Sequence, residues 1–207
     1  MDFFTRCSKS RWLDPTAWRL FVGCLLLVAG LAQAQTGSDI SQLKVERSED
    51  DVLVTAQVQF ELPPAVEEAL QKGIPLYFVA EADILRERWY WYDKKMAAAE
   101  RHLRLAYQPL TRRWRLTMTS GASRGGNQGL SLNQNIDTLA QALAAIKRIS
   151  RWKIADASEL DASQQYRVEF RFRLDLSQLP LPFQIGAMGQ SDWNVGVSLG
   201  APLDMGK

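Results

Sequence analysis

The segment from Tyr166 to Leu174 constrains the fold most, because apolar and charged residues alternate along it without interruption. Apolar side chains occupy every second position, and three arginines and a glutamate occupy the positions between them. A period of two places these two sets on opposite faces of a β-strand. One face is therefore expected to be buried and the other to meet water, as in a sheet with a single covered face.

Alternation of the same kind predicts further strands in both halves of the chain. They are expected over residues 40–47, 52–60, 74–88, 98–107 and 113–118, from about Trp152, and over residues 193–199. The first two should pair as an antiparallel hairpin, and the next three should form an antiparallel meander. Residues 130–132 are a short strand or an extended lead-in, whereas the glycines of residues 121–129 indicate a loop.

Two segments are expected to be helices. Residues 65–73 follow two prolines, carry acidic residues in the first turn, and end in lysine and glycine, which is typical of helix ends. Residues 137–149 carry leucine, alanine and isoleucine at helical spacing, with Ile149 at the end of the stripe. Residues 179–185 contain two prolines and are expected to be extended, away from the centre of a sheet. The predicted fold class is α+β, predominantly antiparallel β and sandwich-like, with two packed helices.

The first 34 residues have the layout of a cleaved secretory signal peptide. Four basic residues precede the apolar run of residues 20–31, and Ala32-Gln33-Ala34 supplies small residues at the positions that a signal peptidase reads. The alternative is an uncleaved anchor, but the run is shorter than the ~20 apolar residues that cross a bilayer. Cleavage after Ala34 would leave residues 35–207 as a single α+β domain in the periplasm, with membrane contact only through the signal peptide before cleavage.

The composition of residues 35–207 excludes several classes of function. Both cysteines, Cys7 and Cys24, lie in the leader, so the exported domain must be held together by its core instead of disulfides. The leader also contains four of the 25 basic residues and two of the 23 acidic residues, which leaves 21 of each. A nucleic-acid partner is therefore not expected, because the basic excess that would attract phosphates is absent.

An aromatic cluster, Trp89-Tyr90-Trp91-Tyr92, is the first candidate binding surface. It closes the longest predicted hairpin, and its apolar area, at ~25 cal/mol for each Å² that could be buried, should be packed or bound to a partner. Alternation places the two tryptophans on one face of a strand and the two tyrosines on the other. We predict that the tryptophans anchor the core and that the tyrosines form the contact surface.

Two arginines of the predicted meander, Arg113 and Arg115, are the second candidate binding surface. They lie on the polar side of their strand and could contact anionic lipid, a cell-wall polymer or an acidic protein. The alternative is that arginines of the meander and of the 166–174 strand form cross-strand pairs with the acids at 81, 83, 87 and 169. The balanced charge of residues 35–207 favours these cross-strand pairs.

Catalytic and metal-binding patterns are weak in this sequence. Ser123 and Ser198 each lie in a glycine-x-serine-x-glycine match, but neither is followed by a helix pattern, and the single histidine, His102, precedes both. One histidine and no cysteine after the leader do not favour a zinc or copper site. The acidic pairs at residues 50–51 and 67–68 are expected to be a solvated turn and a helix start. We predict no metal, no cofactor and no catalytic residue, and the question of enzymatic activity stays open.

Three segments in combination resemble a known bacterial family. They are WYWYDKK at residues 89–95, RLAYQPLTR at residues 104–112 and LDLSQLPLPFQ at residues 174–184. Together they are similar to domain-of-unknown-function family 4390, over about residues 40–198. The resemblance implies an exported proteobacterial protein without assigned activity, whose gene often accompanies that of a nitrogen-regulation-type sensor histidine kinase. It implies no catalytic residues.

The sequence thus favours a non-catalytic binding or accessory protein of the periplasm. Its partner is expected to be an envelope or membrane protein such as a sensor histidine kinase, whose periplasmic part it would modulate. The rival interpretation is an envelope hydrolase or a lipid-binding enzyme. A pocket with converging acids, a serine or His102 would favour the enzyme, whereas a shallow exposed aromatic patch would favour partner binding.

Overall fold

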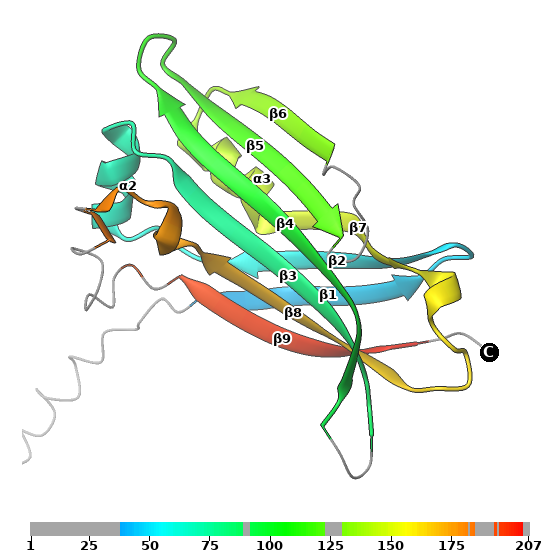
Figure 1. Ribbon diagram of the computed structural model, residues 1–207. Coiled ribbons are helices and arrows are strands. Elements are labelled where there is room, and N and C mark those ends of the chain that lie inside the picture. The colour runs from blue at the N-terminus through cyan, green and yellow to red at the C-terminus, as the bar shows by residue number, and fades with distance from the viewer. Residues whose placement is uncertain are drawn as a thin grey trace, which may run out of the picture. The chain divides into compact units, whose positions relative to one another are not determined.

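Two antiparallel sheets, of three and six strands, form the framework of the protein (Figure 1). The computed structural model describes residues 38–88, 92–122, 130–181, 183–184, 193 and 195–204. The two sheets and two α-helices confirm the predicted α+β, predominantly antiparallel and sandwich-like fold. The predicted leader, residues 1–34, lies outside the described residues.

The smaller sheet has the order β1-β2-β7 and joins distant parts of the chain. Its strands are β1 (Asp39–Arg47), β2 (Asp51–Gln59) and β7 (Arg148–Asp156). β1 and β2 form the predicted hairpin. β7 adds to β2 with two shifts of register, and Arg151 lies in one of them with a positive φ of 42°. The backbone N–H of Arg151 donates to Thr55 Oγ1 at 3.2 Å. This side chain therefore gives the N–H group a hydrogen-bond partner within the bulge, where the regular strand pairing is interrupted.

The larger sheet has the order β6-β5-β4-β3-β8-β9, so the predicted meander lies in the middle of it. Its strands are β3 (Leu76–Arg86), β4 (Lys94–Gln108), β5 (Arg113–Ala122), β6 (Leu130–Ile136), β8 (Tyr166–Leu174) and β9 (Gly196–Leu203). β4 begins earlier than expected because Arg86 pairs with Lys94 and extends the ladder towards the hairpin turn. β9 begins after the predicted position, and Trp193 lies before it, buried in the core.

Among the described residues, α2 (Pro64–Gln71) and α3 (Leu139–Lys147) are the α-helices that pack on the sheets, and short 3₁₀ turns are formed by η2 (Ala157–Glu159) and η3 (Leu176–Gln178). Thr138 caps α3, because its side chain accepts the Gln141 N–H at 3.3 Å. The prediction that Ile149 belongs to this helix is wrong. The backbone becomes extended at Arg148, and Ile149 lies in β7 opposite Ala56, since pairing with β2 replaces the last helical turn.

The prediction that residues 179–185 are extended is wrong at Leu181, Phe183 and Gln184, which are helical, whereas Leu179 is extended as predicted. The N–H groups of Phe183 and Gln184 both donate to the Pro180 carbonyl, at 2.9 and 3.2 Å, which is a helical turn. Proline suits the first turn of a helix because its missing N–H would have no partner there. Pro182 and Ile185 lie outside the described residues.

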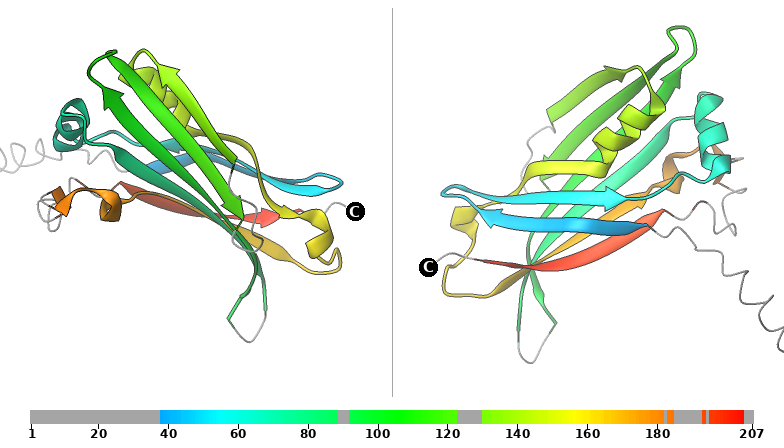
Figure 2. Two further views of the ribbon diagram at one scale, coloured as in Figure 1. Left: turned by 45° about the horizontal axis from the view of Figure 1, so that its top comes forward. Right: turned by 180° about the vertical axis from the view of Figure 1, so that it is seen from behind.

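The core lies between the two sheets and forms one continuous cluster. The smaller sheet and α3 lie on the same side of the larger sheet, and β1 lies beside β9 (Figure 2). Three rings join the sheets at its centre: Phe60, just after β2, packs on Phe78 of β3 and Phe172 of β8, with centroids 5.5–5.7 Å apart. We call the side of the larger sheet that faces the smaller sheet its inner face, and the opposite side its outer face.

Candidate functional site

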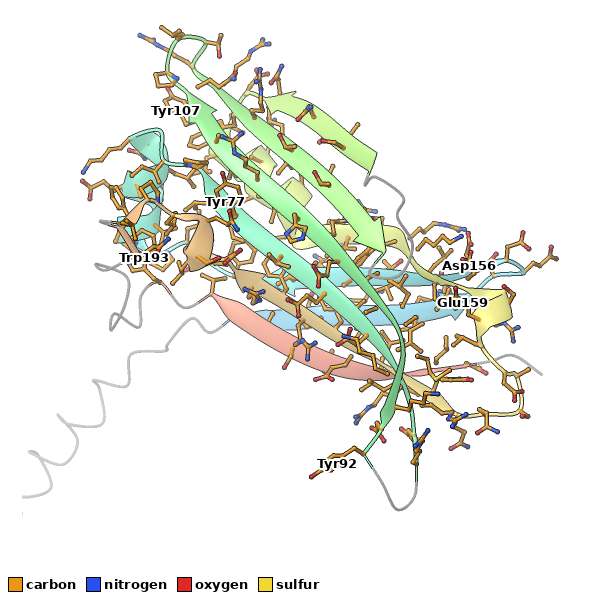
Figure 3. The ribbon with its side chains drawn as sticks, in the orientation of Figure 1. Tyr77, Tyr92, Tyr107, Asp156, Glu159 and Trp193 are labelled. Atoms are coloured by element: carbon orange, nitrogen blue, oxygen red, sulfur yellow. The ribbon has the colours of Figure 1, made fainter. Side chains whose placement is uncertain are left out.

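The β3–β4 hairpin extends past its neighbouring strands and carries the predicted aromatic cluster (Figure 1). β8 begins opposite Arg86 and β5 ends opposite Ala99, so beyond these positions the hairpin has no neighbouring strand among the described elements. We call residues 86–95 the arm. Tyr92 is the first residue that the structure describes after positions 89–91 of the cluster, and its side chain is 95% exposed. It points away from the sheets (Figure 3). Trp89, Tyr90 and Trp91 lie outside the described residues, so their predicted roles stay predictions.

Two ion pairs tie the arm to the body of the larger sheet. Asp93 accepts from Arg167 Nη2 at 3.1 Å, and Lys95 Nζ lies 2.7 Å from Asp83 Oδ1. Asp83 is only 6% exposed and is the one buried charged residue among those described. Its second oxygen, Oδ2, accepts from Arg171 Nη2 at 2.6 Å. The buried carboxylate therefore holds one end of the arm against the centre of the sheet.

The Asp83 pair is part of a larger network on the outer face. Arg171 also donates to Glu81 at 3.3 Å, and Arg173 donates to the other oxygen of Glu81 at 3.0 Å. Partial burial of Arg171 acts to lower the pKa of its guanidinium, but the surrounding carboxylates outweigh that effect and raise this pKa above its ordinary value. These contacts are the cross-strand pairs expected for the arginines of the 166–174 strand. Arg171 and Arg173 are thus paired within the sheet.

The second candidate surface lies at the other end of β4 from the arm. Arg113 pairs with Gln108, the last residue of β4, so the length of that strand separates it from the arm by roughly 50 Å. Tyr92 and Tyr107 mark the two ends (Figure 3). Arg113 pairs with Asp137 at 3.2 Å, and Arg115 donates to Asn135 at 3.5 Å. The structure therefore does not join these arginines to the aromatic cluster in one site.

The residues considered for hydrolysis do not converge in the described structure. Ser198 on β9 lies opposite Arg171 on β8, whereas His102 lies on β4, so β8 and β3 separate them by roughly 14 Å. His102 contacts Glu100 at 3.5 Å, and both side chains are about half exposed. Ser198 also lies within a strand instead of at a strand-to-helix turn. Ser123 lies outside the described residues.

The acidic pairs lie in ordinary surface contacts. Asp51 shares Lys153 with Asp156, at 2.6 Å each, and these two contacts raise the pKa of Lys153. Glu68 pairs with Lys72 along α2 at 2.7 Å. In the described part of the chain, no group of three potential ligand side chains is placed to hold a metal ion. Among the same residues, no helix is long and apolar enough to cross a membrane.

An inward-pointing cation, Arg101, is a feature that the sequence reasoning missed. Its guanidinium lies 4.9 Å from the centre of the Trp152 ring of β7 and donates from Nε to Ser120 Oγ at 3.0 Å. Burial lowers the pKa of Arg101, and no carboxylate of the described residues forms an ion pair with it. The alternation that placed Leu103 and Leu105 inward also places residue 101 inward, so the strand pattern contained the signal.

Because no carboxylate depends on Arg101, its replacement by an unbranched apolar side chain should be tolerated. Arg101→Met is expected to change the free energy of unfolding by less than about 1 kcal/mol, since the methionine keeps the contact with Trp152 and removes a desolvated charge. Arg101→Ala should cost more, because it also loses that contact. Urea unfolding of both variants checks this order, and equal losses for the two would contradict it.

The architecture defines a class of protein: a two-sheet antiparallel α+β domain from which one charged and aromatic hairpin projects. The chain belongs to the family described as domain of unknown function DUF4390, whose model matches residues 35–199. This match confirms the family indicated by the three sequence segments. Comparison with curated proteins finds no match, and comparison with solved structures finds none either.

Proposed function

We propose that this protein is an exported, non-catalytic binding or accessory protein of the periplasm, and that the arm contacts an envelope membrane protein such as a sensor histidine kinase. The observation that carries the proposal is the almost complete exposure of Tyr92 at the end of a tethered, projecting hairpin. Export rests on the sequence of the first 34 residues. The kinase as partner rests on what the family resemblance implies.

The chemistry of the arm suits recognition of a protein surface. Tyrosine and tryptophan dominate the binding energy of protein interfaces, because they bury a large area with few rotatable bonds. The Asp93–Arg167 and Lys95–Asp83 pairs hold the base of the arm in place before binding, which lowers the conformational entropy lost on association. Arg88 and Lys94, which flank the aromatic cluster in the sequence, are exposed and can favour a partner whose contact surface has an acidic rim.

Site-specific photo-cross-linking in cells tests the proposal directly. A photoreactive amino acid at position 92 is expected to form a covalent adduct with an envelope membrane protein, which mass spectrometry then identifies. The matched control is the same amino acid at Leu110, an equally exposed residue in the β4–β5 turn, which should give no such adduct. A peptide of a sensor histidine kinase in the adduct supports the named partner. Adducts with lipid only, or equal adducts from both positions, would overturn the proposal.

Two further measurements complete the same experiment. The variant Trp89→Ala/Trp91→Ala distinguishes the two possible roles of the tryptophans. A large loss of thermal stability would fit their predicted place in the core, whereas loss of the adduct with thermal unfolding close to that of the wild type would place them on the contact surface. Mass spectra of the exported chain should also give Gln35 as its first residue, and an intact Met1 terminus would refute the predicted cleavage.

A further inference from the structure

The strand β6 forms a sheet edge that carries no charge. It is the last strand of the larger sheet, and it pairs with β5 in an unbroken register from Leu130 to Ile136. Its sequence, LSLNQNI, contains no charged residue and no proline. Leu132 is 50% exposed, and Ser131 and the three residues after Leu132 are exposed as well. An uncharged edge without bulges presents a row of backbone N–H and C=O groups that can pair with another strand.

The other sheet edges in the described structure are blocked. β1 and β9, the edge strands of the two sheets on one side, lie against each other. β7, the remaining edge of the smaller sheet, is interrupted by two shifts of register and by the positive φ of Arg151. Bulges, charges and coverage are the usual ways in which proteins prevent strands from pairing at an edge. Only β6, among the described edges, has none of these.

The helix next to β6 is also uncharged, apart from Lys147 at its last position. α3 lies on the inner face of the larger sheet and contacts β5 and β6. Its exposed residues are Ala140, Gln141 and Ala144, and Leu143 is partly exposed. From Leu130 to Ile146 the chain contains a single charged residue, Asp137, which pairs with Arg113. A surface this long with a single, paired charge is typical of an interface, because charged residues are depleted where surfaces are buried.

We propose that two copies of this chain associate through β6, as antiparallel neighbours across a two-fold axis perpendicular to the sheet. The occupant is a second copy because β6 is complementary to itself: antiparallel self-pairing brings no like charges together. A different partner would have to be selected by charges or pockets along the edge, and β6 offers no charge. The joint sheet would have β6 of both copies at its centre, with both α3 helices on the same side.

The symmetry fixes which residues meet if Asn133 lies on the axis. Asn133 then faces its own copy, and Ser131 faces Asn135 of the second copy. Directly opposite side chains of antiparallel strands lie on one face of the sheet, and residues 131, 133 and 135 all point to the outer face. On the outer face, pairs across the axis are therefore polar and uncharged.

Disulfide trapping tests the contact. In a chain whose Cys7 and Cys24 are replaced by serine, Asn133→Cys should give a covalent dimer on oxidation, because opposite residues on antiparallel strands come close enough for a disulfide. The control is Ser198→Cys, which is likewise exposed on the outer face, on β9, and should remain monomeric under the same conditions. Equal cross-linking of the two variants would indicate random collision and would overturn the proposal.

A pair of charge variants tests both the association and its register. Ser131→Lys/Asn135→Glu places opposite charges across the axis, and Ser131→Glu/Asn135→Glu places like charges there. Both variants carry the same Asn135→Glu substitution beside Arg115 of β5, so they differ only at position 131. By sedimentation velocity, the like-charge variant should dissociate with a constant at least about tenfold higher than that of the opposite-charge variant. A wild-type chain that stays monomeric at every concentration, or two variants that associate equally, would refute the proposal.

Discussion

Phe78→Ala is expected to lower the free energy of unfolding by about 3–5 kcal/mol, the largest stability loss that we expect for a single substitution in this chain. Phe78 lies on the central strand β3 and is fully buried. Its ring packs against Phe60 at 5.6 Å and Phe172 at 5.7 Å. Alanine would remove the ring that connects the two sheets, and the surrounding strands can collapse only partly into the space that remains.

Urea unfolding of the wild type and the variant, followed by tryptophan fluorescence, measures this loss. Phe78→Leu serves as the graded control, because it keeps most of the apolar volume and should cost less than the alanine variant. Tyr92→Ala is the control for an exposed ring and should unfold like the wild type. A Phe78→Ala loss below about 1 kcal/mol would contradict the packing of the three rings at the centre of the core.

Asp83→Ala is expected to cost about 2–3 kcal/mol, because it leaves two cations near the centre of the outer face without their buried carboxylate. Arg171 keeps its contact with Glu81, whereas Lys95 loses the partner that ties it to the sheet. Both cations remain partly exposed to water, so the loss should be smaller than for a fully buried pair. Denaturant titration measures it.

A double-mutant cycle measures the interaction free energy of the Asp83–Lys95 pair separately from the contacts that each side chain makes with its other neighbours. Lys95→Met alone should cost little, because Lys95 is about half exposed. The double variant Asp83→Ala/Lys95→Met should be more stable than the sum of the two single losses predicts, since it removes both partners. Asp51→Ala, in an exposed pair with Lys153, provides the control and should behave almost as the wild type. Additive losses at positions 83 and 95 would show that the two side chains act independently.

The candidate binding residues were predictable in identity but not in arrangement. The aromatic cluster and the two arginines stand out in the sequence as candidates, and Tyr92 of the cluster is exposed. Nothing in the sequence gives the long separation between the arm and Arg113, because that depends on how far β4 continues in both directions. Arg101 was missed because a cation inside a strand pattern is read as an exposed residue until its ring partner on another sheet is known.

Local alternation by itself determined which side chains are buried along each strand, because neighbouring residues of a strand must point to opposite faces. The 166–174 strand and the first hairpin therefore agree with their prediction almost residue by residue. Only the tertiary structure decided that β7 pairs with β2 while β8 pairs with β3, which divides the strands into two sheets. Pairing of β7 with β2 also places Ile149 in a strand instead of the helix. In the larger sheet, β6 pairs only with β5 and therefore lies at an edge. Strand pairing depends on side chains far apart in the sequence, and no local pattern contains that information.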